Sequence, residues 1–457
     1  MESPENKQSE VLHARLYTPA ICLLIALIHI VMAARGIHVV RMEWWWHLLD
    51  DREMHHDFLR SIYYFHGNPP GLSILTRLAD EVSFGHRYEL LWAILTGMHI
   101  LSFYAFRQAA QKAVRFDSRI PVALIFLNPF IFIYFNYFYN VTLMLCAWCC
   151  LLWLWFSTAS GSKKTIVTFT VFCFFCLIRS SWHIGIVLAA GIWMLSFWDR
   201  PKAKYIALMV FLFALPLSVY IKNYIVFGKF TTSTWLGMNL CRSNMPYNCD
   251  KPISKLEPFV PVPEYAKVIN LDIPYVNKFK NIAQLNKANF NNVRYIVIAD
   301  SSLEAFKQCF SIPFSLKSWA LHGLNNYFNS PSDFIFIYSV KWGEPFPWYS
   351  LDFFDLPDLH YTTASGNKYD VHLAWYMILY PLVMSVLLLK WTSLPAGLKI
   401  ACAVLWLYFF MYTIVDPFEA NRMRFENEPL FWFAILYIWS ERKSLFGKKA
   451  LPATVRI

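Results

Sequence analysis

Long apolar runs recur along the whole chain, and they constrain its fold more than any other feature. A helix of about 20 apolar residues spans the hydrocarbon core of a bilayer. The composition agrees, because 57% of the residues are hydrophobic and only 16% are charged, which is more apolar surface than a soluble core can hold. The runs are Leu16–Ala34, Glu89–Phe106, Ile120–Phe135, Val141–Phe156, Thr165–Ile178, Trp182–Trp198, Tyr205–Val226, His372–Leu389, Ile400–Val415 and Leu430–Trp439. We therefore expect an all-α polytopic membrane protein with about ten transmembrane helices.

Basic residues occupy every second connection between these runs. Lys and Arg recur at 107–119, 163–164, 200–204, 390–399 and 442–449. Because cytoplasmic loops carry the excess of Lys and Arg, this alternation predicts that both termini are cytoplasmic. The first run has no small-residue cleavage pattern before Arg35, so we expect a retained helix rather than a signal peptide.

The complementary connections then face outside, and they hold most of the polar residues that are unusual for a membrane protein. They are residues 35–88, 136–140, 179–183, 227–371 and 416–428. We expect an N-terminal membrane module with the first outer loop at 1–228, an extracytoplasmic loop domain at 229–371 and C-terminal membrane helices at 372–457. Within the long loop, Ser302–Phe328 is expected to be helical.

Several function classes are excluded by what the chain contains. Its net charge of +11 lies mostly in short turns between apolar runs, which indicates topology and not nucleic-acid binding. It has no Gly-rich phosphate loop and no Asp-x-Asp, so a nucleotide-dependent mechanism is not expected. Most of its cysteines lie inside apolar runs, where a thiol behaves as a small hydrophobic group, and no metal site is predicted. Cys241 and Cys249, in a polar segment, are the one candidate disulfide.

The first outer loop carries the candidate catalytic carboxylates. Leu48–Tyr64 is predicted to be an amphipathic helix lying on the membrane behind three consecutive Trp residues. Asp50 and Asp57 are nearly two turns apart and share a face, while Asp51 is rotated by about 100°. A carboxylate held beside apolar surface can act as a general base. The alternative is a solvated acidic face without a catalytic role.

Arginines near the ends of apolar runs are the candidate phosphate ligands. Arg179 lies between two runs with almost no loop, where a charge is costly unless it has a partner. Arg422 and Arg424 lie in the last outer connection, close to Glu426 and Glu428. Phosphate binding, pairing with a carboxylate and, for Arg179, snorkelling to the interface remain open.

Several short motifs in order along the chain resemble the GT-C superfamily of membrane glycosyltransferases. That group includes the protein O-mannosyltransferases and the lipid A aminoarabinose transferases, and the nearest resemblance is to a bacterial GT-C-like group. The motifs are Leu48-Leu49-Asp50, Ser61–Pro70 with its Pro-Pro, Tyr134–Tyr139, Arg179–His183, Lys222–Asn239 and Asn421–Leu430. Phe135 replaces an acidic residue of the group's pattern, Gly71 replaces a Leu and Asn68 replaces a Gln.

The resemblance implies transfer of one sugar from a polyprenyl-phosphate donor to a glycan, lipid or protein acceptor, with inversion at the anomeric carbon. The enzyme would lie in a bacterial cytoplasmic membrane with its active site outside, and would need no cofactor. Asp50 would be the general base, with Asp57 or Asp51 orienting. Phosphate and donor binding would fall to four residues: Arg179, His183, Arg422 and Arg424. The substrate loops would contribute His66, Asn136, Trp235 and Asn239. The loss of an acid at position 135 leaves any scheme with two carboxylates or a metal open.

Two other classes remain. An O-antigen ligase-like or polymerase-like enzyme also combines many helices with a large outer loop, but it relies on Arg and His in the late loop. A lipid or solute transporter would place polar groups near the bilayer midplane. A lipid-wide groove beside Asp50 would favour transfer, and a cavity through the membrane would favour transport.

Overall fold

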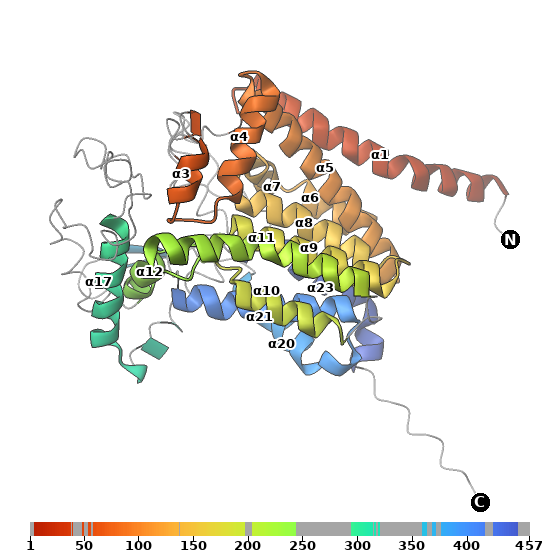
Figure 1. The fold of residues 1–457 in the computed structure, drawn as a ribbon. Helices are drawn as coiled ribbons and strands as arrows, with labels where there is room; N and C mark the ends of the chain where they lie inside the picture. The colour runs from red at the N-terminus through yellow and green to blue at the C-terminus, as the bar shows by residue number, and fades with distance from the viewer. Residues whose placement is uncertain are drawn as a thin grey trace, which may run out of the picture.

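The computed structural model describes most of the chain, and helices dominate the described part (Figure 1). The described residues are 4–37, 39, 48–49, 54–55, 58–136, 138–196, 203–243, 294–313, 315–316, 319, 359–362, 368–371, 376–415 and 424–446. In chain order the first helices are α1 Pro4–Ala34, α3 Phe58–Tyr64, α4 Gly71–Ser83, α5 Arg87–Ala113, α6 Arg119–Phe126, α7 Pro129–Tyr134, α8 Asn140–Trp155, α9 Gly161–Ile178, α10 Ile184–Met194 and α11 Ala203–Phe227. They are followed by α12 Leu236–Ser243, α17 Arg294–Cys309, β1 Leu359–Thr362, β2 Lys368–Val371, α20 Tyr376–Leu389, η4 Trp391–Ser393, α21 Ala396–Val415 and α23 Glu428–Phe446.

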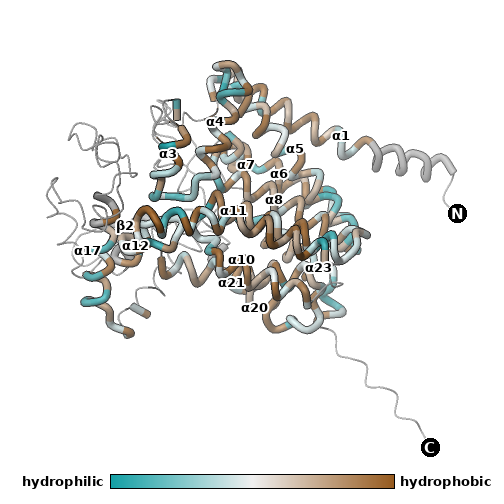
Figure 2. The backbone as a smooth tube through the Cα atoms, viewed as in Figure 1, coloured by the Kyte–Doolittle hydropathy of each residue, from teal (hydrophilic) through white to brown (hydrophobic). Residues whose placement is uncertain are grey.

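Each predicted apolar run contains a described helix, and these helices pack side by side (Figure 1). Five of them are long and apolar enough to cross a membrane: Leu16–Ala34, Arg87–Ala113, Gly161–Ile178, Ala203–Phe227 and Ala396–Val415. Shorter apolar helices lie among them at Asn140–Trp155, Ile184–Met194 and Ile378–Leu389. Figure 2 shows hydrophobic residues along the helices and hydrophilic ones mainly at the turns. The chain is therefore a helical membrane protein.

Packing in the bundle rests on large aromatic side chains. Trp148 of α8 is completely buried and touches the rings of Phe172, Phe175 and Trp182. Lipid tails are as apolar as Leu, so dispersion contacts of this kind, rather than water exclusion, hold membrane helices together. Aromatic residues make up 18% of the sequence, and these ring contacts show how they pack helices together.

The connections alternate between two ends of the bundle. At one end, which we call the basic end, the Tyr17 hydroxyl donates to the Arg119 carbonyl at 2.6 Å, and Arg115 contacts the last turns of α23 through Ser440 and Glu441. At the other, which we call the site end, α3–α4, α7–α8, α9–α10 and α11–α12 are joined. The described connections named here therefore lie at two ends of the helix packing.

The helix boundaries differ from the predictions in three places. The run 120–135 is interrupted, because Pro129 has no N–H and Asn128 instead accepts a hydrogen bond from the Phe130 N–H at 3.1 Å, capping α7. Leu48 and Leu49 are buried and not helical, so a helix that begins at Leu48 was wrong; the described α3 begins at Phe58. In the long loop α17 ends at Cys309, and residues 312–313, 315–316 and 319 are helical again, so the helix predicted over 302–328 is interrupted after Cys309. The loop also holds the β1–β2 hairpin, which an all-α description omits.

The Pro-Pro pair turns the chain, as the sequence indicated. Helix α3 ends at Tyr64, and Pro70 is the N-cap of α4. Gly71 follows, where a Cβ atom would lie only 2.5 Å from the Leu177 carbonyl oxygen of α9. Helices α4 and α9 therefore approach too closely for a side chain at position 71 unless one of them shifts.

Candidate functional site

The site end brings two separate connections and the end of one helix together around Arg179. Helix α9 ends at Ile178, and Arg179 itself adopts an extended conformation, which directs the chain across the end of the bundle to α10. Its guanidinium meets the segment before α23, where Glu426 lies, and the last turns of α21, which carry Tyr408 and Tyr412. These residues are far apart in sequence and form one buried polar cluster.

The centre of the cluster is an ion pair between Arg179 and Glu426. The Nη2 atom of Arg179 lies 3.0 Å from Oε1 of Glu426, and Nε donates to the Tyr412 hydroxyl at 3.2 Å. The Arg179 side chain is 6% exposed and that of Glu426 is completely buried. Burial opposes the charge on Arg179, but the Glu426 carboxylate together with Tyr412, Tyr139 and Tyr408 outweighs it and raises the pKa of Arg179 well above its ordinary value.

Tyr408 completes this centre from the other side of the carboxylate. Its hydroxyl donates to Oε2 of Glu426 at 3.4 Å and accepts a hydrogen bond from the indole N–H of Trp182. Both oxygens of Glu426 therefore have a partner, Arg179 in the connection after α9 and Tyr408 in α21. The arrangement fixes the planar guanidinium of Arg179 in one orientation.

A second buried ion pair lies one turn from the first. Arg424 Nε donates to Oε1 of Glu428 at 3.0 Å, and the guanidinium carbon lies 5.0 Å from the centre of the Tyr380 ring. Arg424 is completely buried and Glu428 is 2% exposed. Each of the two pairs is neutral, so the cluster holds several charges inside an apolar bundle without a net charge.

Unsatisfied amide groups lie beside these ion pairs. Asn427, between Glu426 and Glu428 in sequence, is completely buried, and neither atom of its side-chain amide makes a hydrogen bond among the described residues. The side-chain oxygens of Asn136 and Asn140 are also buried and accept no hydrogen bond among the described residues. Buried amides normally have partners. Polar atoms of this kind next to a charged cluster are typical of a site that receives a polar ligand.

Residues 65–70, which we call the Pro-Pro loop, are hydrogen-bonded to residues 228–235 after α11, which we call the hydroxyl-rich loop because four of them are Ser or Thr. His66 Nδ1 lies 3.0 Å from the Thr234 hydroxyl, and the Thr234 N–H donates to the His66 carbonyl at 3.2 Å. Ser233 donates to the Gly67 carbonyl at 2.7 Å. Tyr220 of α11 connects this loop to α10, because its hydroxyl accepts from the Ile184 N–H at 3.1 Å. The loops that the sequence proposed for substrate are thus joined to the Arg179 connection.

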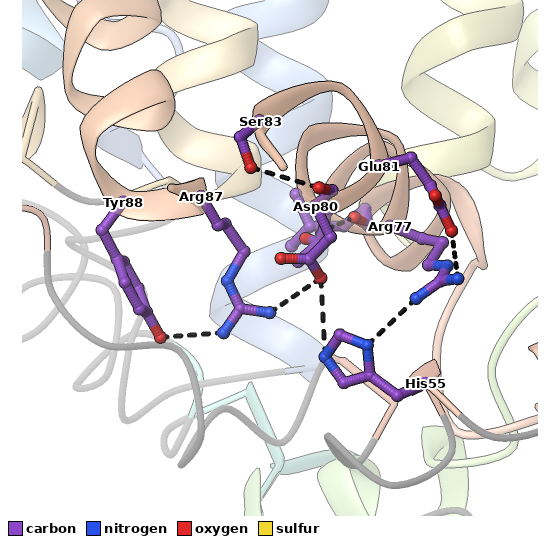
Figure 3. A network of polar contacts seen from close by, with 9 residues as sticks. His55, Arg77, Asp80, Glu81, Ser83, Arg87 and Tyr88 are labelled. Carbon is purple, nitrogen blue, oxygen red and sulfur yellow. Dashed lines mark hydrogen bonds and ion pairs between the residues drawn. The ribbon is translucent and has the colours of Figure 1, made fainter. Parts of the chain in front are cut away.

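A second polar network fixes the first outer loop to the corner between α4 and α5 (Figure 3). Arg87 donates to Asp80 at 2.9 Å and to the Tyr88 hydroxyl at 3.0 Å. His55 lies 3.8 Å from the same Asp80 oxygen and 3.0 Å from an Arg77 nitrogen. The network positions His55, which lies two residues before Asp57, the second predicted carboxylate.

The predicted catalytic carboxylates Asp50, Asp51 and Asp57, and Arg422, lie outside the described residues. Leu49, the residue before Asp50 in sequence, is buried, and its N–H donates to the Ser73 hydroxyl of α4 at 3.2 Å. For Arg179 and Arg424, the carboxylate-pairing alternative describes the contacts that the structure shows.

The remaining predicted residues take different positions. His183 is the N-cap of α10, where its Nδ1 accepts from the Gly185 N–H at 3.1 Å, and partial burial lowers its pKa below the usual value. Asn136 is completely buried and donates to the Phe132 carbonyl. Trp235 packs against Met238 and Ala299. Asn239 lies with Met238 in α12, which packs against α17 and α21.

The sequence did not single out Tyr408, Tyr412 or Trp182. A signal was present: Tyr408 and Tyr412 are four residues apart and share a face of an otherwise apolar helix, which is unusual in a membrane span unless the hydroxyls have partners. Within the described residues, no group of three or more His, Cys, Asp and Glu residues is arranged to hold a metal ion. The seven cysteines described there are free, and the Cys241–Cys249 pair lies outside the side chains that the structure describes.

Comparison with known proteins adds no assignment, because no family model, curated protein or solved structure matches this chain.

Proposed function

We propose that this chain is a membrane glycosyltransferase of GT-C type that transfers a single sugar from a polyprenyl-phosphate donor to an acceptor at the outer face of a bacterial cytoplasmic membrane. The observation that carries the proposal is the buried cluster of Arg179, Glu426 and Tyr408 at the site end. Three of the segments that resemble the glycosyltransferase pattern contribute to it or adjoin it: Tyr134–Tyr139, Arg179–His183 and the end of 421–430. Two others, the Pro-Pro loop and the hydroxyl-rich loop, are hydrogen-bonded to each other nearby.

The charges of the cluster support a role in holding the donor phosphate. The two ion pairs are each neutral, so Arg179 and Arg424 are held in orientation but offer no net charge. Arg422, two residues before Arg424, supplies the uncompensated cation in this scheme. A sugar phosphodiester carries one negative charge, and its phosphate gains a second as the bond to the sugar breaks. Guanidinium groups that are already held in place stabilise this second charge without reorganising.

The chemical step is a single inverting displacement. The Asp50 carboxylate accepts the proton of the acceptor hydroxyl, the oxygen forms a bond to the anomeric carbon, and the bond from that carbon to the phosphate oxygen breaks with its electron pair. Polyprenyl phosphate leaves, and the product has the opposite anomeric configuration. Asp57 or Asp51 orients the acceptor, and the site holds both reactants at the membrane boundary, which supplies the orientation that the reaction requires.

The proposed topology places this chemistry outside. The apolar helices form ten crossings in which α6 and α7 together make one, the basic end faces the cytoplasm, and both termini lie there. The lipid tail of the donor lies along the apolar surface of the bundle, so its affinity comes from contact with lipid-facing helices.

The test is transfer by the purified full chain in liposomes. A polyprenyl-phosphate sugar labelled in the sugar is supplied with membrane extract as acceptor, and the release of polyprenyl phosphate is measured together with labelled product. Arg179→Lys should keep only part of the activity, because an ammonium does not reproduce the fork that contacts Glu426 and Tyr412, and Arg179→Ala should have none. Wild-type rates for an Arg179→Ala protein that elutes as a folded monodisperse species would contradict the proposal.

One observation favours a second candidate, an enzyme of the O-antigen ligase type. Arg424, Glu426 and Glu428 all come from the late connection, and all are buried in the cluster. Such an enzyme would transfer a preassembled glycan from a polyprenyl pyrophosphate. Supplying the two donor types to the same liposomes separates the candidates, because each accepts only its own donor.

A further inference from the structure

A cavity at the basic end has no part in the proposed transfer. It lies between the middle of α1, the last turns of α5 and the connection to α6, and its volume is about 630 Å³. The lining residues that matter here are Thr18, Arg107, Gln108, Gln111, Asp117 and Arg119. A volume of this size accommodates a small polar ligand or a lipid headgroup.

Among the described residues that line the cavity, two cations, Arg107 and Arg119, face one anion, Asp117. Arg119 donates through Nε to both oxygens of Asp117, at 2.9 and 2.8 Å, and its Nη2 lies 2.6 Å from Oδ2. These hydrogen bonds hold the pKa of the Asp117 carboxyl below its usual value, so it is ionised and neutralises Arg119. Arg107 also contributes a full charge, and its Nε atom is buried without a hydrogen bond among the described residues.

The neutral polar groups around Arg107 suit an anion. Gln108 and Gln111 belong to the same helix and line the cavity with their amides, which can donate hydrogen bonds. Tyr17 fixes the opposite wall, since its hydroxyl donates to the Arg119 carbonyl at 2.6 Å. A guanidinium with several neutral donors in a cavity is the arrangement that binds the tetrahedral oxygens of a phosphate.

The surroundings indicate how such a phosphate is presented. Tyr104 lines the cavity and is 38% exposed, and Leu101, one turn away on α5, is 42% exposed. On α1, Leu23 is 61% exposed next to the cavity residue Cys22. The cavity thus opens beside apolar surface that contacts lipid chains, at the end of the bundle where the connections are basic.

We infer that this cavity binds the phosphate group of an anionic ligand, with Arg107 as its main ligand and Gln108 and Gln111 as supporting donors. The site lies at the opposite end of the bundle from Arg179 and is independent of the proposed transferase activity. A lipid headgroup and a soluble phosphate present the same chemistry to these residues, and binding measurements on the full chain separate them.

The experiment is native mass spectrometry of the purified full chain with added phosphatidylglycerol, alongside phosphatidylcholine of the same acyl chains. Wild type should retain phosphatidylglycerol in preference. Arg107→Gln should weaken that retention about tenfold, the size expected for one hydrogen bond to a charged group. Lys112→Gln removes the same charge from the same helix outside the cavity lining and should change retention little.

Two further measurements make the outcome decisive. Thr18→Phe fills the cavity and keeps Arg107, so it should also reduce retention, and it serves if Arg107→Gln does not give folded protein. Stabilisation of wild type by millimolar inorganic phosphate, lost in Arg107→Gln, with no preference for phosphatidylglycerol, would assign the site to a soluble phosphate. Equal lipid retention and equal phosphate response in wild type, Arg107→Gln and Thr18→Phe would overturn the inference. An equal loss in Lys112→Gln would also overturn it, because it would show general charge attraction.

Discussion

Replacing Glu426 by Gln tests whether the buried ion pair organises the site end. The substitution keeps the shape of the side chain and removes its charge, so Arg179 stays buried with a neutral partner. At the observed separation of 3.0 Å, and with an effective dielectric constant of about 20, the charge–charge attraction is about 5 kcal/mol. Much of this attraction offsets the free-energy cost of burying the two charged groups. Removing one partner of a buried pair lowers the free energy of unfolding by about 3 to 5 kcal/mol.

The double variant Arg179→Met with Glu426→Gln removes both charges and should recover much of this loss, since no ion is then left unpaired. The matched control is Lys307→Gln, which breaks an ion pair with Glu304 at 2.7 Å in which both side chains are more than half exposed. Exposed pairs of this kind contribute about 0 to 1 kcal/mol.

The assay is thermal unfolding of the purified proteins in one detergent. For a chain of this size 1 kcal/mol corresponds to about 2 °C, so Glu426→Gln should lower the midpoint by about 6 to 10 °C, while Lys307→Gln should lower it by about 2 °C or less. The double variant should lie between Glu426→Gln and wild type. The reasoning is refuted if Glu426→Gln unfolds at the wild-type temperature, or if the double variant is less stable than Glu426→Gln.

Three further predictions concern the catalytic loop, the helix packing and the topology. Asp50→Asn should lower the transfer rate by about 10²- to 10⁴-fold while donor binding survives, and Asp51→Asn should cost much less, as measured by product formation in liposomes; equal rates would place the base elsewhere. Gly71→Ala should destabilise the protein by about 1 to 3 kcal/mol in thermal unfolding, because its Cβ would lie 2.5 Å from the Leu177 carbonyl, whereas Gly97→Ala, in open space on α5, should not; an unchanged midpoint for Gly71→Ala would show that α4 shifts freely. Reporters fused after residues 112, 163, 202, 395 and 445 should score cytoplasmic and one at 280 should score outside, and a cytoplasmic result at 280 would put the site in the wrong compartment.

The helices of the bundle could be predicted from the sequence because each carries its own signal. Apolar length marks a membrane helix regardless of its neighbours, and Pro129 and the Pro-Pro pair mark breaks through local stereochemistry. Gly228, with φ +68 directly after α11, is a helix end of the same local kind. Where a boundary depends on tertiary contacts the prediction failed: Leu48 and Leu49 are apolar enough for a helix face, but they are buried outside one.

The contacts of the site could be predicted only as alternatives. Charge and depth indicated that Arg179 requires a partner, but which carboxylate it meets depends on how α9 and α23 pack, and that information is not local. The hydrogen-bond partners of the Tyr408 and Tyr412 hydroxyls also depend on this packing, so they could not be predicted from the sequence.

Position 135 carries a buried aromatic residue that packs against two histidines. Phe135 is buried and stacks on His99 with the ring planes 3° apart and the centres 4.5 Å apart. His99 in turn contacts His29 of α1 at 3.0 Å and the Phe126 carbonyl at 3.0 Å. Position 135 thus holds an aromatic ring that packs against a buried histidine pair and offers no carboxylate, so the proposed chemistry relies on the carboxylates of the first outer loop.

The central claim is sugar transfer at the site end, and mass spectrometry of cell-envelope glycans tests it most directly. Envelopes are compared from cells that lack the protein, cells that express it, and cells that express Asp50→Asn at the same level in the membrane. The account predicts a glycan heavier by one sugar residue with wild type only, together with accumulation of the polyprenyl-phosphate sugar in the other two. Identical glycans and identical donor levels in all three would contradict it.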